Sequence, residues 1–138
     1  MSRVININNP GKIRSQQRRT IAEVLRLLMQ KGEIDGEAKD MVATLVFALR
    51  KIGDTIDVTV DAWEKRNYYL KADRFRLDWE WVYSSADRIE KLVVKDRWDM
   101  LPLELAALSQ RFADIKIAKI TRSASTWQGN HRALLEAQ

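Results

Sequence analysis

The stretch NYYLKADRFRLDWEW, residues 67–81, decides the fold, because its aromatic residues are spaced as one side of a long helix. Apolar residues recur through this stretch and beyond it at alternating intervals of three and four positions, which is the period of a half-buried α-helix. The repeat consists of Tyr68, Ala72, Phe75, Trp79, Val82, Ala86, Ile89 and Val93. Arg74 and Arg76 each stand four positions before an acidic residue, so we expect ion pairs along the same helix.

The same spacing predicts three further helices on either side of this one. Their apolar repeats are Ile21, Leu25 and Leu28; Val42, Leu45, Leu49, Ile52 and Ile56; and Leu105, Leu108, Phe112 and Ile115. Lys31 and Gly32 are typical of a helix end, and Asp35 is typical of the N-cap of the next helix. Only one glycine, Gly53, lies between Glu37 and Pro102, so the turn signals of a strand-rich domain are missing.

The predicted fold class is therefore all-α: an antiparallel bundle of four main helices, in one domain spanning residues 1–138, with a long central helical hairpin. Residues 36–97 cannot form one helix, because it would be about 93 Å long in a small domain. We expect the break between the two central helices near residues 66–73. Gly53 and the pair Ser84-Ser85 are the other candidate positions.

The predicted helices differ in length. The two central helices have about 28 to 31 residues and the two outer ones about 20, so the outer helices are about 12 to 16 Å shorter. Short connections make sequential helices antiparallel, which places both outer helices on the same half of the central hairpin. The other half, about residues 56–80, is expected to project beyond them and to carry much of the aromatic content.

Two kinds of cover are open for this projecting half. One is the chain itself, through an N-terminal arm (residues 1–12) with Val4, Ile5 and Ile7, or a C-terminal tail (residues 122–138) with Trp127, Leu134 and Leu135. The other is a second subunit. Leu70, Leu77 and Trp81 favour a partner, because they fall at intervals of seven and four on the face opposite the apolar repeat, and a helix that is apolar on two faces is buried on two sides.

The sequence thus favours a non-enzymatic interaction or assembly module that forms a homodimer, or binds another protein, through this hairpin. The candidate interface residues are Trp63, Tyr68, Tyr69, Leu70, Leu77 and Trp81. We expect a cytoplasmic protein without a cofactor. No apolar run approaches the roughly 20 residues of a membrane span, so no membrane partner is expected.

A second hypothesis is a nucleic-acid-binding accessory protein, because the net charge of +5 is concentrated near the N-terminus. Residues 1–32 hold seven basic side chains and one acidic side chain, whereas residues 33–100 hold twelve and fifteen. Clustered cations attract phosphate backbones without reading sequence. The candidate residues are Lys12, Arg14, Arg18, Arg19 and Arg26.

A third and weaker hypothesis is a carboxylate–metal enzyme. Asp54, Asp57, Asp61 and Glu64 recur at intervals of three, four and three, and such oxygen ligands suit Mg²⁺ or Ca²⁺. The alternative is that these acids form ion pairs with Lys12 and Arg14 on the neighbouring helix. With no cysteine and one histidine, His131, the chain lacks the residues for thiol catalysis or a histidine-based relay, and we expect His131 to be solvent-exposed.

Overall fold

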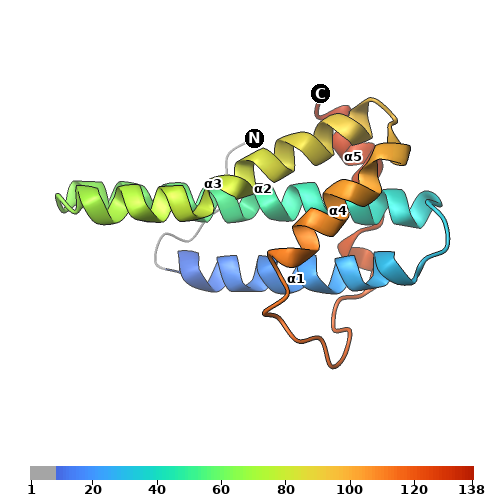
Figure 1. Cartoon of the computed structure of the whole chain (residues 1–138), viewed down its shortest axis with the longest axis horizontal. Coiled ribbons are helices and arrows are strands. Elements are labelled where there is room, and N and C mark those ends of the chain that lie inside the picture. The colour runs from blue at the N-terminus through green and yellow to red at the C-terminus, as the bar shows by residue number, and fades with distance from the viewer. Residues whose placement is uncertain (1–8) are drawn as a thin grey trace.

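The computed structural model describes residues 9–138 and confirms the all-α class, with no strand in this part of the chain (Figure 1). The helices are α1 (Pro10–Gln30), α2 (Gly36–Lys65), α3 (Tyr69–Val94), α4 (Leu101–Gln110) and α5 (Asn130–Glu136). Two short 3₁₀ turns, η1 (Trp98–Met100) and η2 (Ala124–Thr126), precede α4 and α5.

The boundaries of α2 follow from local chemistry. Asp35 is its N-cap, as the sequence predicts, and accepts a hydrogen bond of 2.8 Å from the Ala38 N–H. At the other end α2 stops at Lys65, and α3 starts at Tyr69, inside the predicted range of 66–73. Gly53 and the Ser84-Ser85 pair lie within α2 and α3 respectively.

The turn between α2 and α3 is a Schellman motif that needs no glycine. Asn67 takes a left-handed conformation with φ of 65°, which Asn adopts more readily than most residues. The Tyr68 N–H donates to the Trp63 carbonyl, and the Asn67 N–H donates to the Glu64 carbonyl, each at 2.9 Å. These bonds satisfy carbonyls that the end of α2 would otherwise leave unpaired.

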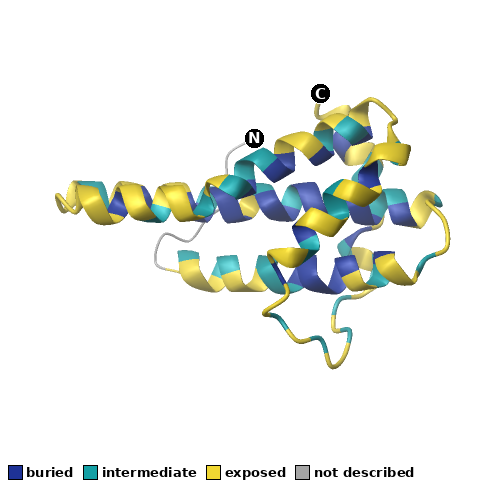
Figure 2. Cartoon of the chain, in the orientation of Figure 1, coloured by how far each residue is buried: buried dark blue, intermediate teal, exposed yellow. Residues whose placement is uncertain are grey.

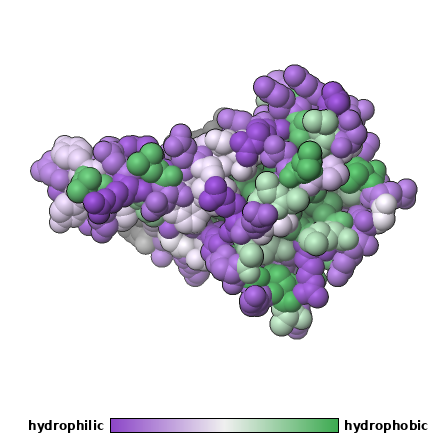
Figure 3. Space-filling view, viewed as in Figure 1, coloured by the Kyte–Doolittle hydropathy of each residue, from purple (hydrophilic) through white to green (hydrophobic). Residues whose placement is uncertain are grey.

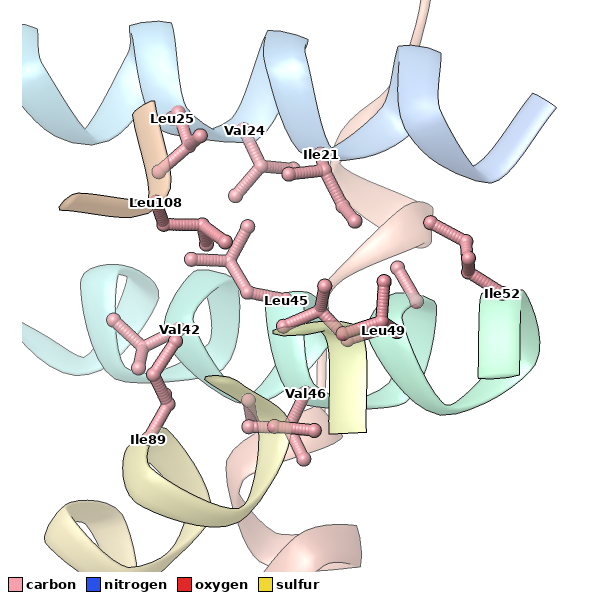
Figure 4. Packing of buried hydrophobic residues seen from close by; sticks show 14 of the residues in the cluster. Ile21, Val24, Leu25, Val42, Leu45, Val46, Leu49, Ile52, Ile89 and Leu108 are labelled. Atoms are coloured by element: carbon pink, nitrogen blue, oxygen red, sulfur yellow. The ribbon is translucent and has the colours of Figure 1, made fainter. Parts of the chain in front are cut away.

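Helix α2 forms the centre of the core, with α1 on one side and α3 on another. Figure 4 shows Val24 and Leu25 of α1 facing Leu45 of α2, while Val42 of α2 lies beside Ile89 of α3. The buried residues concentrate in the half of the molecule where α1, α4 and α5 gather, and the end of the α2–α3 hairpin extends beyond the start of α1 (Figures 1 and 2). The predicted projection of the hairpin therefore exists.

The fourth helix is shorter than predicted. Helix α4 has ten residues rather than about 20, although its apolar repeat continues in Phe112, which is buried, and Ile115, which is partly buried. After Gln110 the chain turns toward α1, where Arg18 contacts the Arg111 carbonyl at 3.5 Å and the Asp114 carboxylate at 2.8 Å. These contacts replace the further helical turns that the spacing predicts.

The C-terminal tail does not cover the projecting hairpin, contrary to one of the two predicted alternatives. It packs against the first half of α2, at the opposite end of the molecule (Figure 1). Trp127 is buried there and its indole N–H donates to Glu37 at 3.1 Å, while Asp40 accepts the backbone N–H groups of Gly129 and His131 at 3.2 and 3.0 Å. Asp40 thereby caps α5 from another helix.

The N-terminal arm, with Val4, Ile5 and Ile7, lies outside the described residues except for positions 9–12.

Gly53 allows α2 and α3 to approach closely. A Cβ atom at this position would lie 2.8 Å from Cε1 of Tyr83, whose hydroxyl group is held 3.0 Å from the Gly53 carbonyl oxygen and 2.8 Å from Asp57. The ring is tethered at its far end, so it cannot easily move away. Glycine is unfavourable in the middle of a helix, and close packing against α3 explains its presence at position 53.

We expect Gly53→Ala to lower the free energy of unfolding by about 1–3 kcal/mol, because the clash outweighs alanine's better helix propensity. Urea denaturation measures the change. Gly36→Ala is the matched control, since no described atom lies within 4 Å of its added Cβ, and it should leave stability unchanged or raise it. Equal stability of the two variants would contradict the close approach.

Candidate functional site: the free end of the α2–α3 hairpin

Exposed apolar side chains gather where the α2–α3 hairpin turns, and we call residues 61–77 the hairpin end. Tyr68, Tyr69, Leu70 and Leu77 have exposed fractions of 52%, 57%, 66% and 69%. This is the slender end of the molecule in Figure 2, and in Figure 3 apolar side chains stand out there among hydrophilic ones. Four of the six candidate interface residues are thus exposed in one place.

The apolar residues surround the hairpin end rather than forming one stripe. Tyr68, Tyr69 and Leu70 are consecutive, and consecutive helical residues point about 100° apart. Tyr68 is also the N-cap of α3, and in the described structure its side chain makes no capping hydrogen bond. Ser, Thr, Asp or Asn would satisfy an N–H group of the first turn. The chain therefore carries an exposed tyrosine where a capping residue would favour the helix.

Cations lie next to these apolar residues. The hairpin end, residues 61–77, holds five basic and three acidic side chains, a net charge of +2. Two of the acids, Glu64 and Asp73, bind Arg76, at 3.2 and 2.8 Å. The predicted ion pair of Arg76 with Glu80 is thus replaced by a pair with Asp73 within α3 and a pair with Glu64 that bridges α3 to α2. Lys65, Arg66, Lys71 and Arg74 are exposed around the end.

A row of aromatic rings connects the hairpin end to the body. The ring centroids of Trp63 and Phe75 are 5.0 Å apart, those of Phe75 and Trp79 are 6.3 Å, those of Trp79 and Trp81 are 6.0 Å, and those of Trp81 and Phe112 are 5.7 Å. We call these five residues the aromatic row. Aromatic pairs at such distances contribute about 0.5–1.5 kcal/mol each beyond the area that they bury, so the row stabilises the attachment of the hairpin end to the body.

Cations cover the faces of this row. The Arg14 guanidinium lies 5.0 and 5.5 Å from the ring centroids of Phe75 and Trp79, and also donates to the Thr55 and Thr59 hydroxyl groups at 3.2 Å each. Lys71 lies 4.3 Å from the Trp63 ring centroid. Arg14 lies about 60 residues before the rings that it covers, so this contact has no local signature in the sequence.

Trp63 and Trp81 are therefore not part of the exposed surface that the sequence predicts. Trp63 is half-buried against Phe75 and Lys71, and Trp81 packs edge-on against Phe112 and beneath Arg111, 4.8 Å from its ring centroid. The second apolar face of α3 does exist. The chain itself covers it at Trp81 and leaves Leu70 and Leu77 exposed.

The basic residues of α1 mostly contact their own chain. Arg18 binds Asp114 and lies 5.4 Å from the Phe112 ring centroid, Arg19 binds Glu23 at 2.6 Å and the Lys119 carbonyl at 2.8 Å, and Arg26 donates to the Ile117 carbonyl. Four of the five candidate nucleic-acid residues, Arg14 included, thus support α3 or residues 111–122. Lys12 is exposed.

Glu23 is a buried carboxylate that sequence reasoning did not single out. Its oxygens accept the Thr121 N–H at 2.7 Å, the Thr121 hydroxyl at 2.6 Å and the Arg122 N–H at 2.9 Å, in addition to Arg19. Burial alone would raise the pKa of Glu23, but these hydrogen bonds lower it to about 2. The signal available in the sequence was a lone acid inside the apolar repeat of the first helix.

Two residues of the acidic stripe of α2 contact α3. Glu64 pairs with Arg76, and Asp57 accepts the Tyr83 hydroxyl; burial together with this bond raises the pKa of Tyr83. Arg14 binds threonines rather than the acids that the sequence assigns to it. Within residues 9–138 no group of three or more His, Cys, Asp or Glu side chains is placed to hold a metal ion.

His131 is half-buried with its ring edge-on to Trp98, at 5.4 Å between ring centroids, so the expectation of a solvent-exposed histidine is wrong.

Comparisons of the chain with protein-family models, with curated proteins and with solved structures find no match. None of the helices in the described residues combines the length and the apolar character needed to cross a bilayer. The function is therefore inferred from the geometry and the chemistry of the chain itself.

We expect Glu23→Gln to destabilise the fold at neutral pH by on the order of 3 kcal/mol, since a pKa lowered from 4.5 to about 2 stabilises the charged folded state. This contribution is fully present above the unfolded-state pKa and is lost as the pH falls through the folded-state value. The stability difference between wild type and variant should therefore shrink between about pH 5 and pH 2. Urea denaturation at several pH values measures it.

The matched control is Glu136→Gln, whose exposed side chain pairs with Arg132 and should contribute less than about 1 kcal/mol at any pH. If the Glu23→Gln deficit does not change with pH, the carboxylate charge is not what holds residues 121 and 122 to α1.

Proposed function

We propose that the chain is a non-enzymatic interaction module that attaches to its partner through the hairpin end. The observation that carries this proposal is the exposure of Tyr68, Tyr69 and Leu70 at the outermost turn of the molecule, while the aromatic residues behind them are packed. Apolar side chains clustered on a projecting surface commonly mark contact sites.

The local chemistry of the turn supports this reading. Position 68 is an N-cap occupied by a tyrosine, and a residue that breaks a local stability rule without an evident structural gain is a candidate for function. The aromatic row and the Arg76 bridge support the end from behind, so the exposed residues are presented on a rigid arm. A rigid surface loses less conformational entropy on binding.

The sequence predicts that the partner is a second copy of the chain. This stays a prediction, and the small exposed surface makes a stable homodimer less favourable. Stable complexes use about 20–30 residues a side, whereas four of the six candidate interface residues are exposed at the hairpin end. A homodimer through this surface would therefore be weak. Sedimentation velocity over a wide concentration range measures it.

We expect the combined substitution of Tyr68, Tyr69 and Leu70 by Ser to change the free energy of unfolding by less than about 1 kcal/mol, because exposed side chains contribute little to folding and Ser favours an N-cap. Urea denaturation measures the change. Phe75→Ser is the control, since this ring packs between Trp63 and Trp79, and it should cost about 3–5 kcal/mol.

A loss for the triple variant as large as that for Phe75→Ser would contradict the proposal. It would mean that the exposed residues of the hairpin end belong to the fold, leaving no surplus apolar surface to be explained by a partner.

A further inference from the structure

We infer that the partner of the hairpin end is the surface of an anionic lipid bilayer, which this end enters as far as the headgroup region. The inference rests on the proposed function and names its partner. It differs from the sequence-based expectation of no membrane partner, because that expectation followed from the absence of a spanning segment, and an interfacial contact needs none.

The shape of the site favours a bilayer over a protein. Tyr69 and Leu70 point about 100° apart around the first turn of α3, and Tyr68 precedes them at the turn itself. A helix or sheet of another protein touches one side of such an end, so it would leave some of these side chains in water. A lipid surface surrounds whatever enters it and therefore contacts all of them.

The residue types match the layers of a membrane interface. Leucine favours the acyl boundary, whereas tyrosine places an apolar ring and a hydroxyl group at headgroup depth. Asn67, Tyr68, Tyr69, Leu70, Lys71 and Arg74 line an open hollow at the hairpin end, in which cations border the apolar side chains. A lipid phosphate is the group that such a border fits.

The position of the charges matches the expected depth. Lys65, Arg66, Lys71 and Arg74 lie within about one helical turn of the exposed tyrosines, where headgroup phosphates are found when an apolar surface enters by about 5–10 Å. Asp57 lies eight residues before Lys65 in α2, about 12 Å back along the helix. The acids of α2 at and before Asp57 therefore stay outside the headgroup layer, whereas Asp61 is exposed about 6 Å before Lys65, within the hairpin end.

Co-sedimentation with vesicles tests the inference on the full chain. Vesicles of phosphatidylcholine with about 30 mol% phosphatidylserine are compared with phosphatidylcholine alone, at about 0.1 and 0.5 M salt. We expect binding to the anionic vesicles that weakens at the higher salt concentration. Comparable binding to neutral vesicles, or no binding to either, would overturn the inference.

Two paired variants separate the apolar and the charged contributions. Tyr69→Ser with Leu70→Ser should reduce vesicle binding at least tenfold. Lys65→Gln with Arg66→Gln should reduce it about 25-fold, at about fivefold for each cation. The matched controls are Leu103→Ser, a leucine 77% exposed on α4, and Lys51→Gln with Arg132→Gln, both exposed and remote from the hairpin end. The controls should change binding less than twofold.

A loss of binding as large in the controls as in the hairpin variants would overturn the inference, because binding would then depend on overall charge. A second outcome would also overturn the inference but leave the proposed function intact. In it, the wild-type chain does not bind vesicles but self-associates reversibly or binds a single-stranded oligonucleotide, and the Tyr69/Leu70 variant abolishes that binding. Absence of vesicle binding together with a large stability loss in that variant would overturn both.

Discussion

Helix α2 is surrounded by the rest of the chain along its first half and is paired chiefly with α3 along its second half. All residues from 41 to 46 are buried, which requires neighbours on every side of the helix. Helices α1 and α3 together with the C-terminal tail supply those neighbours. Past Ile56, Val60 is the one buried residue of α2. The compact body and the projecting hairpin both follow from this difference along one helix.

The basic residues of α1 show how a positively charged segment can be used within its own chain. Guanidinium groups are weakly hydrated and planar, so they cover aromatic faces and donate to several carbonyl oxygens at once. Arg14 covers Phe75 and Trp79, whereas Arg19 bridges Glu23 and the Lys119 carbonyl. The net charge of the N-terminal part is therefore weak support for a phosphate-bearing ligand there. The cations of the hairpin end, with apolar residues beside them, offer more.

Periodicity and capping chemistry predict the elements of this fold well. The apolar repeats give α1 to α3, Asp35 marks the start of α2, and helix length requires a break, which falls within the expected range of 66–73, and predicts the projecting hairpin. The approach fails where long-range contacts decide the outcome. Trp81 is half-covered because Arg111 and Phe112 follow a helix that ends early, and the tail docks near Asp40 because that carboxylate caps α5. Neither contact has a local signature in the sequence.

Glu23 also constrains how the molecule reaches its final state. Its hydrogen-bond partners Thr121 and Arg122 lie 98 and 99 positions later in the chain. Until they are in place, a charged carboxylate in the middle of α1 has no reason to leave water, because burying an unsatisfied ion is costly. During synthesis, α1 is thus expected to dock fully only after residue 122 has left the ribosome. The α2–α3 hairpin needs none of these partners and can form earlier, whereas completion of the body waits for the synthesis of residues 121 and 122.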